Sequence, residues 1–521
     1  MRKQQTDHLI QLIASLTKAE KRHFRLFVTR NQSSNDLLFL QLFEMIDKYQ
    51  DYDEELILKR IPQIKKRQLS NLKAHLYKQL LLSLRLLSRT YNADIEIRER
   101  IDYAKVLYNK GLYRQSLEML DKAKGLATKY RQNVLILEIV EFEKLIESQY
   151  ITRSINTRAE ELTREAYDLA QRALRTQRLS NVALQLYGLY LRIGFVRNEK
   201  DHYFVKEFFH SSLPKYNVED LGFYEKLYLY QSHVWYNHTT QDFLHCYKYA
   251  QKWVDLFHES PEMQQVDPAI YIKGLHNLLS ALFYLSHYTR FVEVLKELEN
   301  FKLNEKNSRI KNLESIFYLF RYIHKINLHY IEGTFDEGTR LVPELVDIID
   351  SKKYHWDNHR IMVFHYRIAC LYFSSGDNDT AIHYLNLILN APNPQIREDI
   401  QCFARFLNLM AHYELGHTQL LEYLVKSVYR FLAKMQELHQ AQKEILTFLR
   451  RLHRIQRKNG LKKEFIKLKS NLEKIQDDPY ERRPFLYLDI ISWLESKIEN
   501  KPVQTVIREK FLKKRLSLTG R

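Results

Sequence analysis

The sequence predicts an all-α protein, a right-handed α-solenoid in which helical hairpins of about 43 residues stack side by side behind an N-terminal helical head. Apolar residues recur at spacings of three and four along most of the chain, which indicates helices that bury one face. Turn residues return at a regular interval, because Gly333, Gly376, Gly416 and Gly460 are separated by 43, 40 and 44 residues. No segment shows the alternation of a β-strand, so we expect only helices.

The composition favours one continuous helical array with short loops. The chain has 521 residues but only 12 glycines and 10 prolines, and no linker rich in Gly, Ser or Pro divides it. Its hydrophobic content of 45% excludes a disordered chain. We expect three parts: a basic helical head at 1–93, a helical-repeat solenoid at 94–478, and C-terminal capping helices with a basic tail at 479–521.

The head is predicted to contain four helices. Thr17 and Glu20 form the T-x-x-E pattern of a capping box, at the start of a helix that continues to about Val28. Further helices are expected at 36–48, after Asp53 as far as Pro62, and at 65–89. Leucines line one face of the last helix and its cations lie mostly elsewhere, so we expect that helix to be amphipathic.

The segment 98–131 contains the clearest hairpin. Its first helix is expected to turn one face inward through Tyr103, Ala104 and Leu107, and Gly111 ends that helix. The second helix then buries four residues at helical spacing, namely Tyr113, Ser116, Leu120 and Ala123. Two such helices cannot cover their own apolar faces, so each hairpin needs a neighbouring hairpin.

Turns and helix starts continue the pattern along the chain. Backward from Gly333, turn markers are expected at Ser286, at 238–241, after Gly194 and at 152–154. Proline at the first helical position, after a capping side chain, predicts helix starts at 267–268, 393–394 and 478–479. Thr334 and Glu337 form a second capping box.

The hairpin at 98–131 resembles a tetratricopeptide repeat, because Ala104, Leu107, Gly111, Tyr113 and the later small residues follow the order of that repeat. A second segment, 362–395, is similar through the following residues: Ala369, Tyr372, Gly376, Ala381, Leu385 and Ile388. The whole chain, with LTKAEKRHF in its head, also resembles a group of uncharacterised bacterial repeat proteins. These resemblances imply stacked hairpins, and they transfer no activity and no ligand residue.

Positive charge is concentrated near the two ends of the chain. The net charge is +18, and the segment 56–93 contains nine Lys or Arg and no acid. Two further basic segments, 450–469 and 501–521, contribute +8 and +6. Such segments attract polyanions, so we expect an anionic partner, whether nucleic acid, the ribosome or an acidic protein. The candidate contacts are Arg67, Lys73, Lys78, Arg450, Arg451, Arg454, Lys462 and Lys463.

The segment 56–73 also fits a helix-turn-helix. A short helix at 56–61 ends before Pro62, and a long helix follows from Lys65. In that arrangement the side chains that face DNA are Arg67, Gln68, Ser70, Asn71 and Lys73. The alternative interpretation is a solvated basic face that binds nothing.

No catalytic, cofactor or metal site is predicted. The sequence GTFDEGTR at 333–340 has two glycines spaced as in a phosphate loop, but the required lysine is missing, so a hairpin turn is favoured. His355 and His359 would share a helix face, yet two ligands make a weak metal site. Three widely separated cysteines, no secretory signal and no membrane span favour the cytoplasm.

The sequence also contains 35 tyrosines, and the segment 224–253 is dense in aromatic residues. These rings could form a binding surface, but their helical spacing favours burial between helices. The predicted function is a non-enzymatic cytoplasmic scaffold or adaptor that binds a protein partner through its helical-repeat surface. The alternative is a nucleic-acid-associated or transcriptional regulator whose head contacts DNA or RNA through 56–93.

Overall fold

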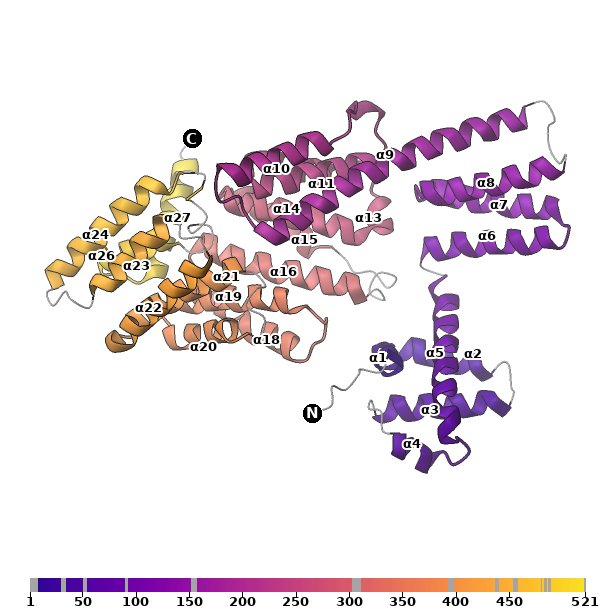
Figure 1. The fold of residues 1–521 in the computed structure, drawn as a ribbon, viewed down its shortest axis with the longest axis horizontal. Helices are drawn as coiled ribbons and strands as arrows, with labels where there is room; N and C mark the ends of the chain where they lie inside the picture. The colour runs from indigo at the N-terminus through magenta and orange to yellow at the C-terminus, as the bar shows by residue number, and fades with distance from the viewer. Residues whose placement is uncertain are drawn as a thin grey trace. The chain divides into compact units, whose positions relative to one another are not determined.

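The computed structural model describes residues 8–519 except 30–33, 50–53, 90–91, 151–156, 302–310, 392–397, 436–439, 453–457, 479, 482–484 and 486–488. All regular secondary structure in these residues is helical, which confirms the all-α class (Figure 1). The chain divides into two compact units, unit 1 at Met1–Ala173 and unit 2 at Leu174–Arg521.

The predicted head lies in unit 1 and has a hydrophobic core of its own. Its helices are α1 (His8–Ser15), α2 (Lys18–Thr29), α3 (Ser34–Tyr49), α4 (Glu54–Arg60) and α5 (Lys66–Ser88). Phe24 and Phe43 meet edge to face at 4.8 Å in this core. The capping box is confirmed, because the Glu20 amide donates to Thr17 Oγ1 at 3.2 Å and the Thr17 amide donates to Glu20 Oε2 at 2.7 Å.

The predicted hairpin forms in the second half of unit 1. The helices there are α6 (Ala93–Asn109), α7 (Tyr113–Lys129), α8 (Asn133–Gln149) and the first part of α9 (Arg158–Ile193). Gly111 connects α6 to α7 with φ of +77°, and the buried Ser116 hydroxyl donates to the Ala104 carbonyl at 2.7 Å. The prediction for Tyr103 was wrong: its side chain is 44% exposed, because the neighbouring Ala104 faces the α7 interface instead.

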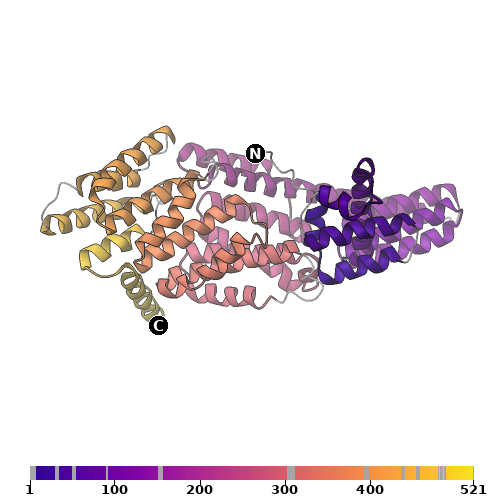
Figure 2. The same ribbon diagram turned by 90° about the horizontal axis from the view of Figure 1, so that it is seen from below.

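Unit 2 is itself an array of neighbouring helices (Figure 2). Its helices after α9 are α10 (Glu199–Ser212), α11 (Phe223–Thr239), α12 (Phe243–Glu259), α13 (Met263–Val266), α14 (Pro268–Tyr284), α15 (Tyr288–Glu299), α16 (Lys311–Glu332), α17 (Phe335–Thr339), α18 (Val342–Asp350), α19 (Asn358–Ser375), α20 (Asn378–Leu389), α21 (Glu398–Glu414), α22 (Thr418–Met435), α23 (Gln440–Leu452), α24 (Lys458–Ile475), α26 (Ile490–Glu499) and α27 (Val503–Thr519). Each helix packs mainly on its neighbours in sequence, which fits an α-solenoid.

Six hairpin turns of unit 2 each contain one residue in the left-handed region, in addition to Lys352, His355 and Asn500 in other connections. The six turn residues are Gly194, Gln241, Ser286, Gly333, Gly376 and Gly416. All six turns were expected at or close to these positions, and the turn at 238–241 uses Gln241, a residue type that rarely adopts a positive φ. Gly460 was wrongly predicted as a turn, because it lies inside α24, which begins two residues earlier at Lys458.

Two predicted helix caps form other contacts. Asp267 precedes α14 as expected, with Pro268 in its first turn, but its carboxylate accepts a hydrogen bond from the Tyr224 hydroxyl at 2.5 Å. Thr334 does not cap α17, since its hydroxyl contacts Nδ1 of His329 at 2.8 Å. The predicted starts at 393–394 and 478–479 involve residues outside those that the structure describes.

The C-terminal helix α27 returns to the middle of unit 2 and packs on α16 and α19. The Arg508 guanidinium donates to the Glu332 carbonyl at 3.0 Å, and Gln504 exchanges two hydrogen bonds with Asp336, at 2.9 and 2.7 Å. Gly333 allows this approach, because a Cβ there would lie 2.6 Å from the Arg508 backbone nitrogen. The helix therefore depends on one glycine of the α16 turn.

Candidate binding channel

A cavity of about 1440 Å³ runs through unit 2, and we call it the channel. Most of its lining comes from five helices that each begin a hairpin: α9, α11, α14, α16 and α19. The helix α14 shows how the sequence builds the wall, since Ile270, Lys273, Asn277, Ser280 and Tyr284 face the channel at alternating spacings of three and four. That spacing places the five residues on one face of a helix.

Aromatic rings form the wall near α9 and α11. Trp235 lies between two tyrosines of α9, with ring centroids 4.7 Å from Tyr187 and 5.6 Å from Tyr190. Tyr284 of α14 continues this wall and stacks on Phe243 at 4.4 Å. Such rings bury large apolar areas at low conformational cost, so they suit a surface that packs against another chain.

Part of this wall is exposed to solvent. Leu184 of α9 lines the channel and is 68% exposed, and Tyr187 and Leu191 on the same helix are also exposed. Exposed apolar side chains that gather in a concave surface are a common sign of a binding site. The α9 face is therefore the part of the channel that is most available to a ligand.

Cations outnumber acids in the lining by six to two. The cations are Lys273, Arg360, Arg367, Lys510, Lys514 and Arg515, and the acids are Asp357 and Asp489. Arg360 pairs with Asp357 at 3.1 Å. Lys273 has no carboxylate partner among the described residues, and burial together with the charge of Arg360 lowers its pKa.

A buried histidine pair lies beside the channel. Nδ1 of His276 on α14 lies 2.8 Å from Nε2 of His324 on α16, so one imidazole donates to the other. Burial lowers the pKa of His276 to about 3 and that of His324 well below its ordinary value, which keeps both rings neutral near pH 7. His276 also stacks on Phe320 at 3.9 Å, so the pair acts as packing between two walls.

The helix α27 forms one side of the channel. Phe511 is buried against Tyr288 with ring centroids 4.8 Å apart, and the Arg515 guanidinium lies 5.4 Å from the same ring. The Lys514 ammonium donates to the Ser286 carbonyl at 3.3 Å. The basic tail of the chain thus supplies part of the positive charge of the channel.

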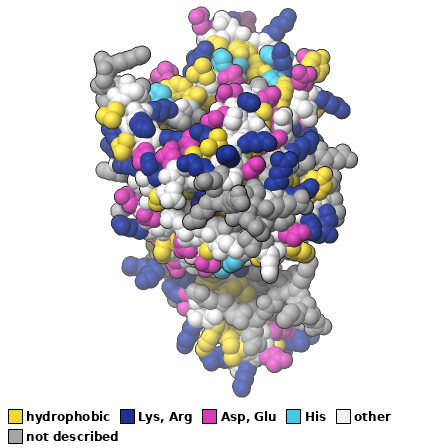
Figure 3. Space-filling model, turned by 90° about the vertical axis from the view of Figure 1, so that its left-hand side faces the viewer, with side chains coloured by type: hydrophobic (Ala, Val, Ile, Leu, Met, Phe, Trp, Pro, Cys, Tyr) yellow, Lys and Arg dark blue, Asp and Glu magenta, His cyan; other side chains and the backbone are white. Residues whose placement is uncertain are grey.

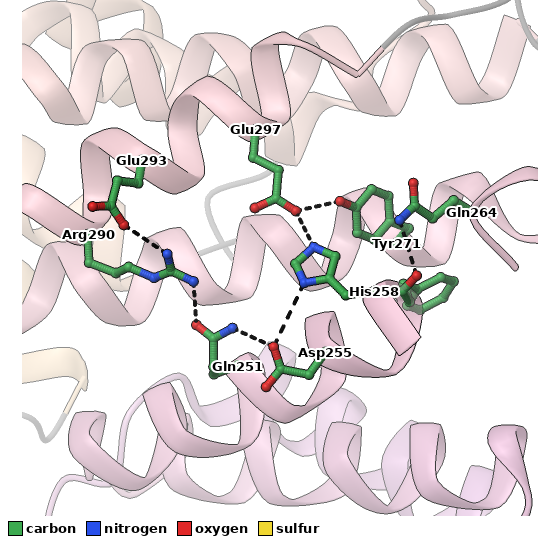
Figure 4. A network of polar contacts seen from close by, with 9 residues as sticks. Gln251, Asp255, His258, Gln264, Tyr271, Arg290, Glu293 and Glu297 are labelled. Carbon is green, nitrogen blue, oxygen red and sulfur yellow. Dashed lines mark hydrogen bonds and ion pairs between the residues drawn. The ribbon is translucent and has the colours of Figure 1, made fainter. Parts of the chain in front are cut away.

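A polar network joins α12, α14 and α15 (Figure 4). Glu297 accepts from the Tyr271 hydroxyl at 2.5 Å and lies 2.6 Å from Nε2 of His258. Arg290 donates to Gln251 at 3.2 Å, which connects α15 to α12. These side chains satisfy one another across three helices, so the network fixes how successive hairpins pack.

The predicted contacts for an anionic partner lie at solvent-exposed positions in both units. In unit 1, Arg67 and Lys78 are exposed on α5, and Lys73 is half-buried. In unit 2 the exposed candidates on α23 and α24 are Arg450, Arg451, Lys462 and Lys463. Figure 3 shows Lys and Arg side chains interspersed with acids at this end of unit 2. Arg454 lies outside the described residues.

No family model, curated protein or solved structure matches this chain.

The function must therefore be argued from the residues of the chain itself. None of the described helices has the length and apolar composition needed to cross a membrane. Within the described residues, no group of three or more His, Cys, Asp or Glu side chains is arranged to hold a metal ion. His355 precedes α19, which begins at Asn358, so it does not share a helix face with His359 as the sequence suggested.

Two other predicted features are packing elements. In the GTFDEGTR segment, Gly333 follows α16 and Gly338 is buried inside α17, where a Cβ would lie 2.8 Å from Leu371. The eight Tyr and Trp side chains of the segment 224–253 are all buried or half-buried, which confirms the packing interpretation. Trp235 nevertheless borders the channel, so it serves both packing and lining.

Sequence reasoning missed the channel itself. The available signal was the set of polar residues that interrupts the apolar helix α14 at helical spacing, above all Lys273 and Ser280. A polar stripe within a strongly apolar helix indicates a second face that is not packed. The lining faces of the five helices converge only after the helices stack, and a single sequence gives no measure of that convergence.

Proposed function

We propose that the chain is a non-enzymatic scaffold or adaptor of the cytoplasm, and that it binds a segment of a partner protein in the channel of unit 2. The observation that carries this proposal is the exposed apolar face of α9, which lines a cavity of about 1440 Å³. A concave surface of this kind allows many modest contacts to add up along an extended ligand. The excess of lining cations favours a segment that contains acidic side chains.

We also propose that the helices form right-handed repeats of the tetratricopeptide type. The six turn residues Gly194, Gln241, Ser286, Gly333, Gly376 and Gly416 support this, because they follow one another after 47, 45, 47, 43 and 40 residues. Their spacing is longer than the usual tetratricopeptide unit and fits longer helical repeats. In such an array the first helix of each hairpin faces the concave side, which agrees with the helices that line the channel.

The experiment compares two leucines of nearly equal exposure. Leu184 is 68% exposed and lines the channel, whereas Leu244 on α12 is 64% exposed and does not line it. The tagged full chain and its Leu184→Glu and Leu244→Glu variants are used to recover partners from the native cytoplasm, with and without nuclease.

We expect one protein to be recovered with and without nuclease, to be lost with Leu184→Glu and to be retained with Leu244→Glu. Both positions are solvent-exposed, so neither change disturbs the fold. Equal recovery by the two variants would show that the channel does not bind the partner. Loss of every partner after nuclease treatment would instead favour an association with nucleic acid.

A further inference from the structure

The cations of the basic segment 56–93 fall into two groups. At the C-terminal end of α5, Arg85 pairs with Asp102 at 2.9 Å and Arg89 pairs with Glu99 at 3.2 Å, both on α6. Their charge is therefore compensated within unit 1. At the other end of the segment, the exposed cations of α4, of the turn and of the first half of α5 are Lys59, Arg60, Lys65, Lys66, Arg67 and Lys78.

These six residues make a surface that we call the α4–α5 corner. The described carboxylates neutralise little of the positive charge of the corner. Among the described residues, the six cations form one ion pair, between Lys66 and Glu54 at 3.7 Å. Arg60 contacts the Tyr49 hydroxyl and the face of the same ring, and none of the described carboxylates forms an ion pair with it. A compact group of exposed cations of this size produces a positive field that attracts a polyanion.

The helix α5 is presented rigidly at this corner. Leu69, Leu76 and Leu80 are buried in the core of the head, and α5 packs there on α2 and α3. The opposite face of its first turns is exposed and contains Arg67, Ser70, Asn71, Ala74 and Lys78. The donors Arg67 and Asn71 are four residues apart, and the small side chains of Ser70 and Ala74 lie beside them on this face.

Such a face matches the major groove of B-DNA, which admits an α-helix. Asn and Arg side chains read adenine and guanine edges, and flanking Lys and Arg side chains bind phosphates. The major groove of A-form RNA is too narrow for a helix, so duplex RNA fits this face less well.

We propose that the α4–α5 corner binds duplex DNA, with the exposed face of α5 in the major groove and the cations of the corner on the phosphates. This site belongs to unit 1, whereas the channel is lined by residues of unit 2. Arg67 and Asn71 lie at the groove, and Lys59 and Arg60 of α4 lie at the backbone.

The test measures binding of the full chain to a fluorescein-labelled DNA duplex of mixed sequence over a range of salt concentrations. The variant Arg67→Ala/Lys78→Ala removes two corner cations. The control Lys122→Ala removes an exposed cation of α7 that has no described carboxylate partner. Unlabelled double-stranded RNA and poly-glutamate serve as competitors.

We expect the wild-type affinity to fall steeply with salt, with a slope of about 0.9 per phosphate contact in a plot of log affinity against log salt. The double variant should weaken binding roughly tenfold or more, whereas the Lys122→Ala control should bind like the wild type. Poly-glutamate and RNA should compete less well than unlabelled duplex DNA.

Three results would each overturn the proposal. The first is no binding of the duplex at low salt. The second is equal binding by the double variant and the Lys122→Ala control, which would place any DNA contact elsewhere. The third is equal displacement by poly-glutamate, which would make the corner a general surface for polyanions. Each result leaves the channel proposal intact, because that proposal is tested at Leu184.

Discussion

The substitution Gly333→Ala should weaken the packing of the C-terminal helix α27 at the side of the channel. Gly333 has φ of +65°, and a Cβ at this position would lie 2.6 Å from the backbone nitrogen of Arg508 in α27. Alanine in the left-handed region costs roughly 1–2 kcal/mol. The clash is with backbone, which cannot rotate away as a side chain can, so we add about 1–3 kcal/mol for overpacking.

The matched control is Gly416→Ala. Gly416 ends α21 with φ of +73°, and a Cβ there would meet no atom within 4 Å. It therefore has the backbone strain of the first variant without the clash. We expect Gly416→Ala to cost about 1–2 kcal/mol and Gly333→Ala to cost about 1–3 kcal/mol more, unless α27 moves away and relieves the clash.

The clash can either lower the free energy of unfolding or displace α27. Urea unfolding measures the first effect and amide hydrogen exchange in α27 measures the second. The clash predicts one of two results for Gly333→Ala. Either this variant loses more unfolding free energy than Gly416→Ala, or residues 503–511 exchange faster at unchanged stability. If the two variants lose equal stability and α27 exchanges at the wild-type rate in each, the reasoning that links Gly333 to the docking of α27 is refuted.

Further predictions concern stability and thiol reactivity. In the folded protein the pKa of His276 is about 3 and that of His324 is well below its ordinary value, so unfolding below about pH 6.5 takes up protons. The contribution of both rings to stability is therefore complete above this pH. As the pH decreases toward 3, the free energy of unfolding should fall by up to about 1.4 kcal/mol per pH unit for each ring. Urea unfolding at several pH values checks this, and the His276→Gln variant should show a weaker dependence. Gly274→Ala should destabilise the fold, because the new Cβ would lie 3.0 Å from Nε1 of the buried Trp253. Gly125→Ala has open space around its Cβ and should stabilise the fold by up to about 1 kcal/mol through helix propensity. Thermal unfolding of both variants measures whether each change lowers or raises stability. The three cysteines are buried and free, so a thiol reagent should modify them only after denaturant is added, and fast reaction of the folded protein would contradict their burial.

Local chemistry explains which elements could be predicted from the sequence. The Thr17 capping box forms because its two residues need only each other, and the turn at Gly111 forms because glycine alone tolerates its φ at no steric cost. Thr334 has the same sequence pattern as Thr17, yet its hydroxyl contacts His329, which competes for the same oxygen. Gly460 failed as a turn marker because glycine is also tolerated in the first turn of a helix.

The candidate sites depended on contacts between distant segments. The nine cations at 56–93 looked equivalent in the sequence, but Arg85 and Arg89 form ion pairs with acids of α6, and the sequence does not distinguish them from Arg67 in this respect. The channel likewise requires Tyr187, Lys273 and Arg360 to converge from three helices. Hydrophobic periodicity predicts on which face of its helix a residue lies. It does not predict which other helix packs against that face.

A helix that lines the channel packs on its neighbours with one face and lines the channel with another, and this separation has an evolutionary consequence. On α14 the residues that hold the array together, such as Leu275 and Leu279, lie on a different side from Lys273 and Ser280. Substitutions in the lining can therefore change ligand preference one helix at a time while the interlocking of the hairpins is preserved. A lineage that keeps this scaffold can exchange its partners without having to reinvent its fold.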